Sequence, residues 1–371
     1  MKKKIIVLIS LLLSCTIFTG CLDIKYYEEI GFILTAAVEY DNGSLQGTYL
    51  LPAVDAQNKG KDEVEILDVD DIKSMRDGRQ KSRLSSQKRT EAGKIQQVLL
   101  SRDLAEKGIG NLLQIFERDT SNPNQSYVII VDGSPREMLN KLHEIPEKPR
   151  ISFYINELIK NNIKDSNIPE TRLYNVGINK YAEYIDIMAP VIKGSKNGVS
   201  VAGTALFSET KMTGFIDVKD SLLLLAMMNK FKTGEYTLPP LPGEPDLPQP
   251  NHGLVFKIRD SKSKIKVKIV DNIPTVDIKV KMDCVLDEKS LNEPMDKKLQ
   301  AKIEKHISDE LQKRCISVLA YTKEVGSDPI GIGNLFRAKY NEHFKKNPWS
   351  CKKIKYNVTV SANLRNFGLF R

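Results

Sequence analysis

Apolar and polar residues alternate most regularly in the last third of the chain. Residues 264–269, 276–282 and 354–362 alternate with a period of two, which is typical of strands with one buried and one wet face. Between them, residues 296–324 place apolar side chains at four-residue steps and so form one stripe of a long helix. The pattern predicts an α+β domain over residues 251–371, in which an antiparallel sheet is covered by a long helix.

The pattern is more mixed in the first 150 residues. Asn42-Gly43 lies between apolar runs and predicts a hairpin. Residues 62–94, acidic at first and then basic, are interpreted as a solvated loop or sheet edge. Short apolar runs at 97–100 and 126–131 predict strands, the second covered on both faces.

Helix signals follow each of these two strands. Ser101 can cap a helix that runs through Lys107, and Ser134-Pro135 gives a cap with a proline at the first helical position. The order strand, helix, strand, helix predicts a parallel strand pair with a crossover helix. Further on, residues 151–183 predict helices, 185–217 strands and 219–231 another helix.

A proline-rich segment and a change of charge coincide near residue 250. Residues 239–250 contain six prolines in twelve positions, so they form neither a helix nor a central strand and are interpreted as a semi-extended linker. The net charge of the whole chain is +9. Residues 251–371 carry 25 Lys and Arg against 14 Asp and Glu, a balance of +11, whereas residues 1–250 carry 31 against 33. We therefore place a domain boundary at this linker.

The first residues predict an export signal. Three lysines at 2–4 precede an apolar stretch of 14 residues at 5–18, which is too short for the roughly 20 residues of a membrane-spanning helix. The stretch ends at Thr19-Gly20-Cys21, which resembles a bacterial lipobox and implies a diacylglycerol lipid on Cys21 and cleavage before it. An ordinary secretory signal with an incidental cysteine is the alternative. The longest later apolar run, residues 222–228, is also too short to span a bilayer.

Motifs for catalysis, metals and cofactors fail on inspection. His143 and Glu144 begin a zinc-like helix motif, but Pro146 would break the turn that aligns its ligands. Gly331-x-Gly333 lacks the third glycine of a dinucleotide loop. The sequence therefore predicts no catalytic, metal or cofactor-binding residues.

Three cysteines follow Cys21 in the chain: Cys284, Cys315 and Cys351. We interpret them as free thiols, with Cys284 and Cys315 buried by the apolar parity of their segments. A disulfide between Cys284 and Cys351 stays open as an alternative.

Several short segments together resemble one known family over essentially the whole chain. They are Gly20-Cys21-Leu22-Asp23, Leu104-Ala105-Glu106-Lys107-Gly108, Arg118-Asp119, Gly203-Thr204-Ala205-Leu206-Phe207, Lys211-Met212-Thr213-Gly214, Asp328-Pro329-Ile330-Gly331-Ile332-Gly333 and Trp349. In this order and spacing the chain resembles the spore germination receptor C-subunit lipoproteins, the Ger(x)C family. It departs from the family after the lipid cysteine, where Ile24-Lys25-Tyr26-Tyr27 replaces an opening rich in charged residues.

The resemblance implies a non-enzymatic subunit of a nutrient germinant receptor, anchored to the outer face of the spore inner membrane. Its partners would be an A subunit and a transporter-like B subunit, both membrane proteins. It also implies an extracytoplasmic lipoprotein of three α+β domains. We assign a signal peptide to 1–20, domain I to 21–148, domain II to 149–238, the linker to 239–250 and domain III to 251–371.

Two other functions compete with this one. A solute-binding lipoprotein of an importer would need two similar α/β lobes, and a surface-anchored hydrolase would need a nucleophile or metal motif. Nucleic acid is a poor candidate partner, because an export signal precedes the chain and few aromatic residues interleave with its lysines.

Two groups of residues are candidates for a role. Gly331 and Gly333 suit a structural turn with positive φ or close backbone approach. Alternation predicts that one set of lysines shares the wet face of the C-terminal sheet: Lys264, Lys266, Lys268, Lys279 and Lys281. This lysine face would meet a protein partner or anionic lipid, or it is a solvated surface that discourages edge pairing.

Overall fold

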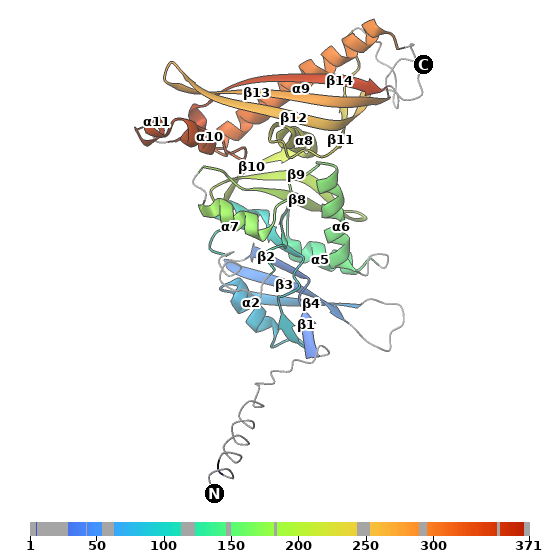
Figure 1. Cartoon of the computed structure of the whole chain (residues 1–371). Helices are drawn as coiled ribbons and strands as arrows, with labels where there is room; N and C mark the ends of the chain where they lie inside the picture. The colour runs from blue at the N-terminus through green and yellow to red at the C-terminus, as the bar shows by residue number, and fades with distance from the viewer. Residues whose placement is uncertain are drawn as a thin grey trace.

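The computed structural model describes Ile5 and residues 29–41, 43–53, 63–112, 123–145, 150–181, 184–242, 253–288, 295–346 and 349–366. The described chain is elongated. Its first strand, β1 (Ile30–Phe32), lies at one end, and the C-terminal sheet and long helix lie at the other (Figure 1). Cys21, the signal segment apart from Ile5, and residues 243–252 in and after the linker lie outside the described residues.

The first two thirds of the chain build one eight-stranded mixed sheet, in the order β10-β9-β8-β7-β6-β2-β3-β4. Its strands are β2 (Thr35–Asp41), β3 (Ser44–Ala53), β4 (Glu63–Ile72), β6 (Gln97–Ser101), β7 (Tyr127–Val131), β8 (Met188–Ser195), β9 (Gly198–Ser208) and β10 (Lys211–Asp217). Neighbours from β2 through β6 and β7 to β8 run parallel, and the outer pairs run antiparallel. The predicted parallel pair, β6 and β7, forms its centre and is buried at every position.

Helices cover both faces of this sheet, which is why its central strands are buried and mostly apolar. On one face α5 (Pro135–His143) and α6 (Ile151–Lys164) share a core with alternate strand residues. On the other lie α2 (Met75–Ser82), α3 (Arg102–Lys107) and α7 (Leu173–Tyr181). The predicted caps are confirmed, since Ser101 and Ser134 accept the backbone N–H of Leu104 and Glu137.

Residues 62–94 contain more regular secondary structure than their high charge predicted. The acidic stretch is the edge strand β4, as one of the two interpretations held, but the basic stretch contains α2 and β5 (Arg89–Glu91) rather than a loop. Strand β5 pairs in parallel with β1 in a separate two-stranded sheet. The charged residues of α2 mask its periodicity, and Met75, Gly78 and Ser82 alone are its buried positions.

The C-terminal sheet has four strands in the order β11-β12-β13-β14. They are β11 (Gly234–Leu238), β12 (Leu254–Val270), β13 (Ile273–Glu288) and β14 (Lys355–Asn366), and the long helix α9 (Lys297–Glu324) packs on them. The expectation of a wholly antiparallel sheet was wrong, because β14 runs parallel to β13. Alternation of side chains sets the two faces of a strand but not its direction. Here the chain passes through α9 after β13 and returns to the end of the sheet where β13 began, so β14 runs in the same direction as β13.

Helix α8 (Val218–Met227) connects the two sheets. Its buried leucines pack in one core with α9 and the C-terminal sheet, and this core also contains Met188, Leu206 and Ile216 from the central sheet. The Arg314 guanidinium of α9 pairs with Asp217 at 2.9 Å and with Asp220 at the start of α8. The chain is thus a mixed α/β protein, and its division into three domains stays a prediction.

Candidate functional site

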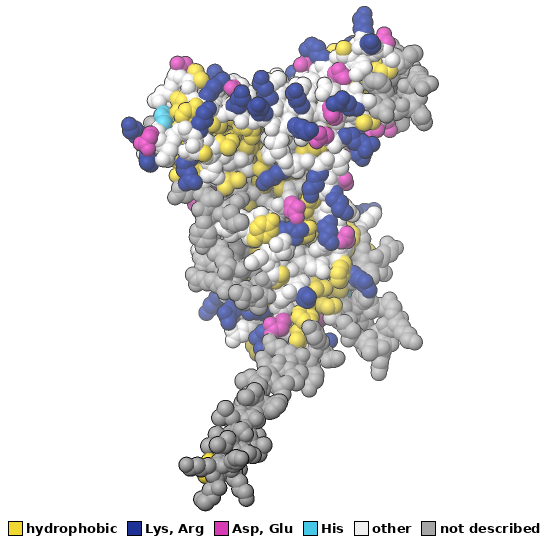
Figure 2. Space-filling view, viewed as in Figure 1, with side chains coloured by type: hydrophobic (Ala, Val, Ile, Leu, Met, Phe, Trp, Pro, Cys, Tyr) yellow, Lys and Arg dark blue, Asp and Glu magenta, His cyan; other side chains and the backbone are white. Residues whose placement is uncertain are grey.

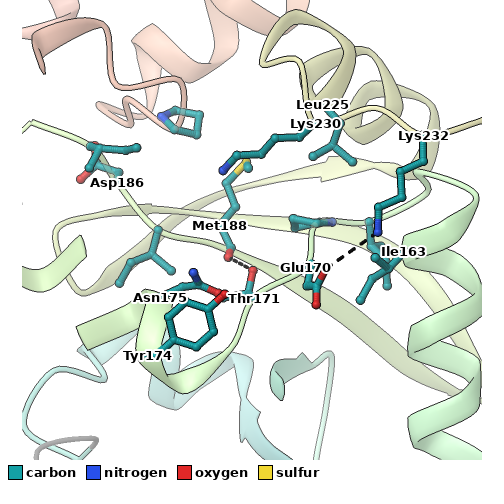
Figure 3. Close-up of a pocket in the computed structure, with 15 residues that line it drawn as sticks. Ile163, Glu170, Thr171, Tyr174, Asn175, Asp186, Met188, Leu225, Lys230 and Lys232 are labelled. Carbon is teal, nitrogen blue, oxygen red and sulfur yellow. Dashed lines mark hydrogen bonds and ion pairs between the residues drawn. The ribbon is translucent and has the colours of Figure 1, made fainter. Parts of the chain in front are cut away.

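A cavity of about 370 Å³ lies where the central sheet meets the segments that lead to the C-terminal sheet. Its wall comes from α6 and α7 on one side, β8 on another, and α8 with the residues after it on a third (Figure 3). One lining residue from each of these four elements is, in the same order, Ile163, Tyr174, Met188 and Leu225. We call it the cleft cavity.

The segment after α6 forms the floor of the cleft cavity. Ser166 adopts a left-handed backbone (φ = 55°), and its hydroxyl accepts the backbone N–H groups of Lys232 and Thr233 at 2.8 and 3.3 Å. Thr171 donates to the Met188 carbonyl at 2.6 Å (Figure 3). These bonds hold the chain after α8 and strand β8 at fixed positions around the cavity.

Four charged side chains line the cleft cavity, and three of them have partners. Glu170 accepts from Arg172 at 2.8 Å and lies 3.8 Å from Lys232. Asp186 accepts two backbone N–H groups, those of Asp328 and Glu209, at 2.7 and 2.8 Å. Lys230 points into the cavity, and no carboxylate of the described residues lies within ion-pair distance of it (Figure 3). Desolvation lowers the pKa of Lys230.

Asp186 also ties the central sheet to the C-terminal part of the chain. Its carboxylate accepts the N–H of Asp328, and its own N–H donates to the Asp328 carbonyl at 3.0 Å. Burial raises the pKa of Asp186, while the two N–H donors oppose this shift. A reciprocal link of this kind joins two residues 142 positions apart and fixes the edge of the cleft cavity beside Pro329.

Residues 328–333, here called the Asp328 loop, contain both glycines singled out from the sequence. The buried Asp328 carboxylate accepts the backbone N–H groups of Gly331, Ile332 and Gly333 at 2.8–3.0 Å. These residues begin α10 (Ile332–Lys339), so the carboxylate caps that helix. Burial raises the pKa of Asp328 to about 6; the three N–H donors act against this shift, and the neighbouring Asp186 adds to it.

The two glycines occupy different environments. Gly331 has φ = 77°, a left-handed backbone that favours glycine. A Cβ atom on Gly333 would lie 2.8 Å from the Trp349 ring and 2.8 Å from the Tyr184 Cβ. The proposed structural role of both glycines stays a prediction, which the Gly333 substitution in the Discussion addresses.

Trp349 belongs to an aromatic cluster beside α10. Its ring lies 5.6 Å from Phe336 and 5.7 Å from Phe344, which follows in α11 (Asn341–Lys346). The three rings and Tyr340 line a smaller cavity of about 190 Å³. The cluster packs against the C-terminal core, and its Trp349 ring contacts the Asp328 loop at Gly333.

The structure places all five lysines of the lysine face on β12 and β13, alternating with residues of the C-terminal core. Lys264 faces Lys279 across the two strands, and Lys266 faces Asp277. Lys268, the most covered of the five, pairs with Asp277 at 2.7 Å, whereas the other four are exposed. Lys and Arg side chains gather over the C-terminal part of the molecule in Figure 2. No partner for this face is part of the structure, and its role stays a proposal.

The three cysteines after Cys21 are free in the structure. Cys284 and Cys315 are buried, as their sequence parity predicted, and Cys351 is half-buried. Burial raises the pKa of the Cys284 and Cys315 thiols to about 12. Within the described ranges, no group of His, Cys, Asp and Glu side chains is arranged to hold a metal ion. The same ranges contain no helix that is long and apolar enough to cross a membrane.

Sequence reasoning did not single out the polar residues of the cleft cavity. Lys230 follows the apolar run at 222–228 and belongs to no motif, and Asp186 has no local signal either. Asp328 did carry one, because an Asp-Pro step followed by two glycines is typical of a capped turn before a helix. The cavity itself was not predictable, since its walls come from segments far apart in the chain.

Two family models match adjoining parts of the chain. The model described as spore germination protein N-terminal domain matches residues 23–194, and the model described as spore germination B3/GerAC like, C-terminal, matches residues 202–368. Spore germination protein GerQC of Bacillus cereus is 24% identical over 362 residues, which cover 94% of this chain and 95% of that protein. Spore germination protein B3 of Bacillus subtilis (strain 168) is 22% identical over 383 residues, with 94% of each chain covered.

One solved structure has a similar fold. The crystal structure of the GerBC protein superposes with a TM-score of 0.55 and covers 89% of this chain and 97% of that one. The two sequences are 15% identical over the match, so this similarity concerns the fold alone.

Proposed function

Because the chain belongs to the Ger(x)C family of spore germination proteins, we propose that it is the lipoprotein C subunit of a nutrient germinant receptor in the spore inner membrane. The observation that carries this proposal is the match of the N-terminal and C-terminal family models over most of the chain. Its role would be to assemble with the A and B membrane subunits so that nutrients trigger germination.

The proposed action is binding rather than catalysis. The family is not known as enzymes, and no histidine, cysteine or serine is among the residues that line the cleft cavity. The solute-binding alternative gains no support from the fold. An eight-stranded mixed sheet and a four-stranded sheet do not form two similar lobes.

The proposed anchor gives the molecule an orientation. With a lipid on Cys21, the seven residues 22–28 would separate this anchor from Glu29, a reach of at most about 28 Å for an extended chain. Strand β1 would then lie near the membrane, and the C-terminal sheet would lie at the remote end of the described chain (Figure 1). This arrangement favours a protein partner or solvent over the same membrane as the neighbour of the lysine face.

A fatty-acid labelling experiment tests the anchor. We expect an alkyne-tagged palmitate to label the wild type and Cys15→Ala, and to miss Cys21→Ala, because Cys21 alone follows the small residues of the lipobox-like segment. Spore inner-membrane fractions should retain the wild type and Cys15→Ala and lose Cys21→Ala. Equal labelling of all three proteins would contradict the assignment of the lipid to Cys21.

Co-purification tests the receptor role separately. An affinity tag on the C-terminus should recover the proposed A and B membrane subunits from detergent-solubilised spore membranes. A strain that lacks this chain should fail to germinate with nutrients and should still germinate with a non-nutrient trigger such as dodecylamine. Normal nutrient germination in that strain, without a second gene of the family, would refute the proposed function.

A further inference from the structure

The cleft cavity has the features of a small-molecule site that neither the family similarity nor the proposed function assigns. We propose that it binds a small molecule in which one carboxylate is attached to a compact apolar body, and that Lys230 pairs with the carboxylate. The inference is independent of the receptor role, because it concerns a cavity within this chain alone.

The balance of charge around the cavity favours an anion. The Glu170 carboxylate is already neutralised by Arg172 at 2.8 Å. Both oxygens of Asp186 accept backbone N–H groups, so that this carboxylate is engaged as well. Lys230 is therefore the charged group of the lining that lacks an ion-pair partner among the described residues. Lys232, whose ammonium lies 3.8 Å from the Glu170 carboxylate, is a second cation in the same wall.

The position of Lys230 also favours an anion. Its ammonium group lies over the cavity between Met188 and Asp186 (Figure 3), while the residue as a whole stays exposed. Desolvation there lowers the pKa of Lys230, which means that the charged form is held at a cost. A carboxylate beside it would remove that cost, because an opposite charge stabilises the ammonium form.

The remaining walls define the body of the ligand. Apolar side chains, among them Ile168, Ile185, Met188 and Leu225, make up somewhat more than half of the lining residues. The volume of about 370 Å³ lies in the range of small-molecule sites, which are mostly apolar with few polar groups. A branched aliphatic carboxylate fits this pattern, whereas a phosphate alone would leave the apolar walls uncovered.

The site is also placed to affect the joint between the two sheets. Lys230 and Leu225 come from α8 and the residues after it, and Ile168 comes from the segment after α6. A ligand that contacts both sides binds the arrangement seen in the structure better than any arrangement in which these walls separate. Binding should therefore raise the melting temperature of the chain.

Titration calorimetry on the full-length chain in detergent micelles tests the proposal. The probe is 4-methylpentanoate, and the comparison ligands are its uncharged amide and inorganic phosphate. The variants are Lys230→Met, which removes the charge, Lys230→Arg, which keeps it, and Lys196→Met, a control at the exposed turn between β8 and β9. Thermal unfolding without ligand establishes that each variant is folded.

We expect the wild type to bind the carboxylate, and Lys230→Met to bind it about tenfold or more weakly, as for loss of a charged hydrogen bond, with Lys196→Met within about twofold of wild type. Lys230→Arg should retain most of the affinity. The amide should bind wild type and Lys230→Met equally weakly. Absence of carboxylate binding at millimolar concentration would overturn the proposal, and so would tight binding of the amide or of phosphate in place of the carboxylate.

Discussion

Replacing Asp328 by asparagine should remove a pH dependence of stability that burial imposes on this carboxyl group. Burial raises its pKa from the ordinary 3.8 to about 6 in the folded chain. Between these values the folded chain holds a proton that the unfolded chain has released. The free energy of unfolding therefore falls as the pH rises through this window, and the contribution of the protonated group is lost above about pH 6. Asparagine does not titrate, so the variant lacks this decline.

The pKa values give the size of the effect. A difference of about two pKa units corresponds to about 3 kcal/mol over the whole titration, of which about 2 kcal/mol falls between pH 4 and pH 7. This figure is an upper value, because Asp186 titrates nearby and its own pKa is raised. Asparagine still offers one oxygen to Gly331 and Ile332, but its amide group would face the N–H of Gly333. The variant should therefore be less stable than wild type at pH 4, and this deficit should shrink or reverse at pH 7.

The single tryptophan makes the measurement local. Trp349 packs against the Asp328 loop at Gly333, so its fluorescence reports unfolding of this region during urea titration. Wild type and Asp328→Asn are compared at about pH 4.5 and pH 7, the two sides of the folded pKa. Asp296→Asn, at the exposed cap of α9, is the matched control for exchanging a capping carboxylate for an amide. If wild type instead gains stability over Asp328→Asn as the pH rises, the three N–H donors outweigh burial and the reasoning is refuted.

Two further predictions concern the glycines and the lysine face. Gly333→Ala should lower the free energy of unfolding by about 1–3 kcal/mol in urea denaturation, because the new Cβ would lie 2.8 Å from the Trp349 ring. The control Gly194→Ala, whose new Cβ would have its nearest neighbour at 3.9 Å, should leave the free energy of unfolding nearly unchanged. Equal effects of the two substitutions would contradict the packing argument. Protein that begins at residue 22, and so lacks both the apolar signal segment and the lipid cysteine, should not sediment with anionic vesicles at low salt. A triple Lys264/Lys266/Lys268→Glu variant should behave the same, since we favour solvation of that face; salt-sensitive sedimentation that the triple variant loses would show a membrane contact instead.

The sequence by itself determined the local structure of much of this chain. The apolar run at β7 specified a strand buried on both faces, because no polar residue interrupts it, and the run at 97–100 specified the neighbouring strand β6. Ser101 and Ser134 specified the starts of two helices through bonds that span three residues. The stripe on α9 and the alternation on β12 and β13 specified their buried faces. The order of short segments was enough to identify the family.

The tertiary structure alone decided how these elements associate. Alternation is the same in parallel and antiparallel strands, so the direction of β14 depended on the crossover through α9. The β2–β4 strands and the β8–β10 strands joined one sheet through β6 and β7, a pairing that no local pattern encodes. Asp186 and Asp328 met across 142 positions, and Lys230 reached a cavity whose floor lies more than 50 residues earlier in the chain. Such contacts depend on packing between distant segments, and a residue's own neighbours in sequence carry no record of them.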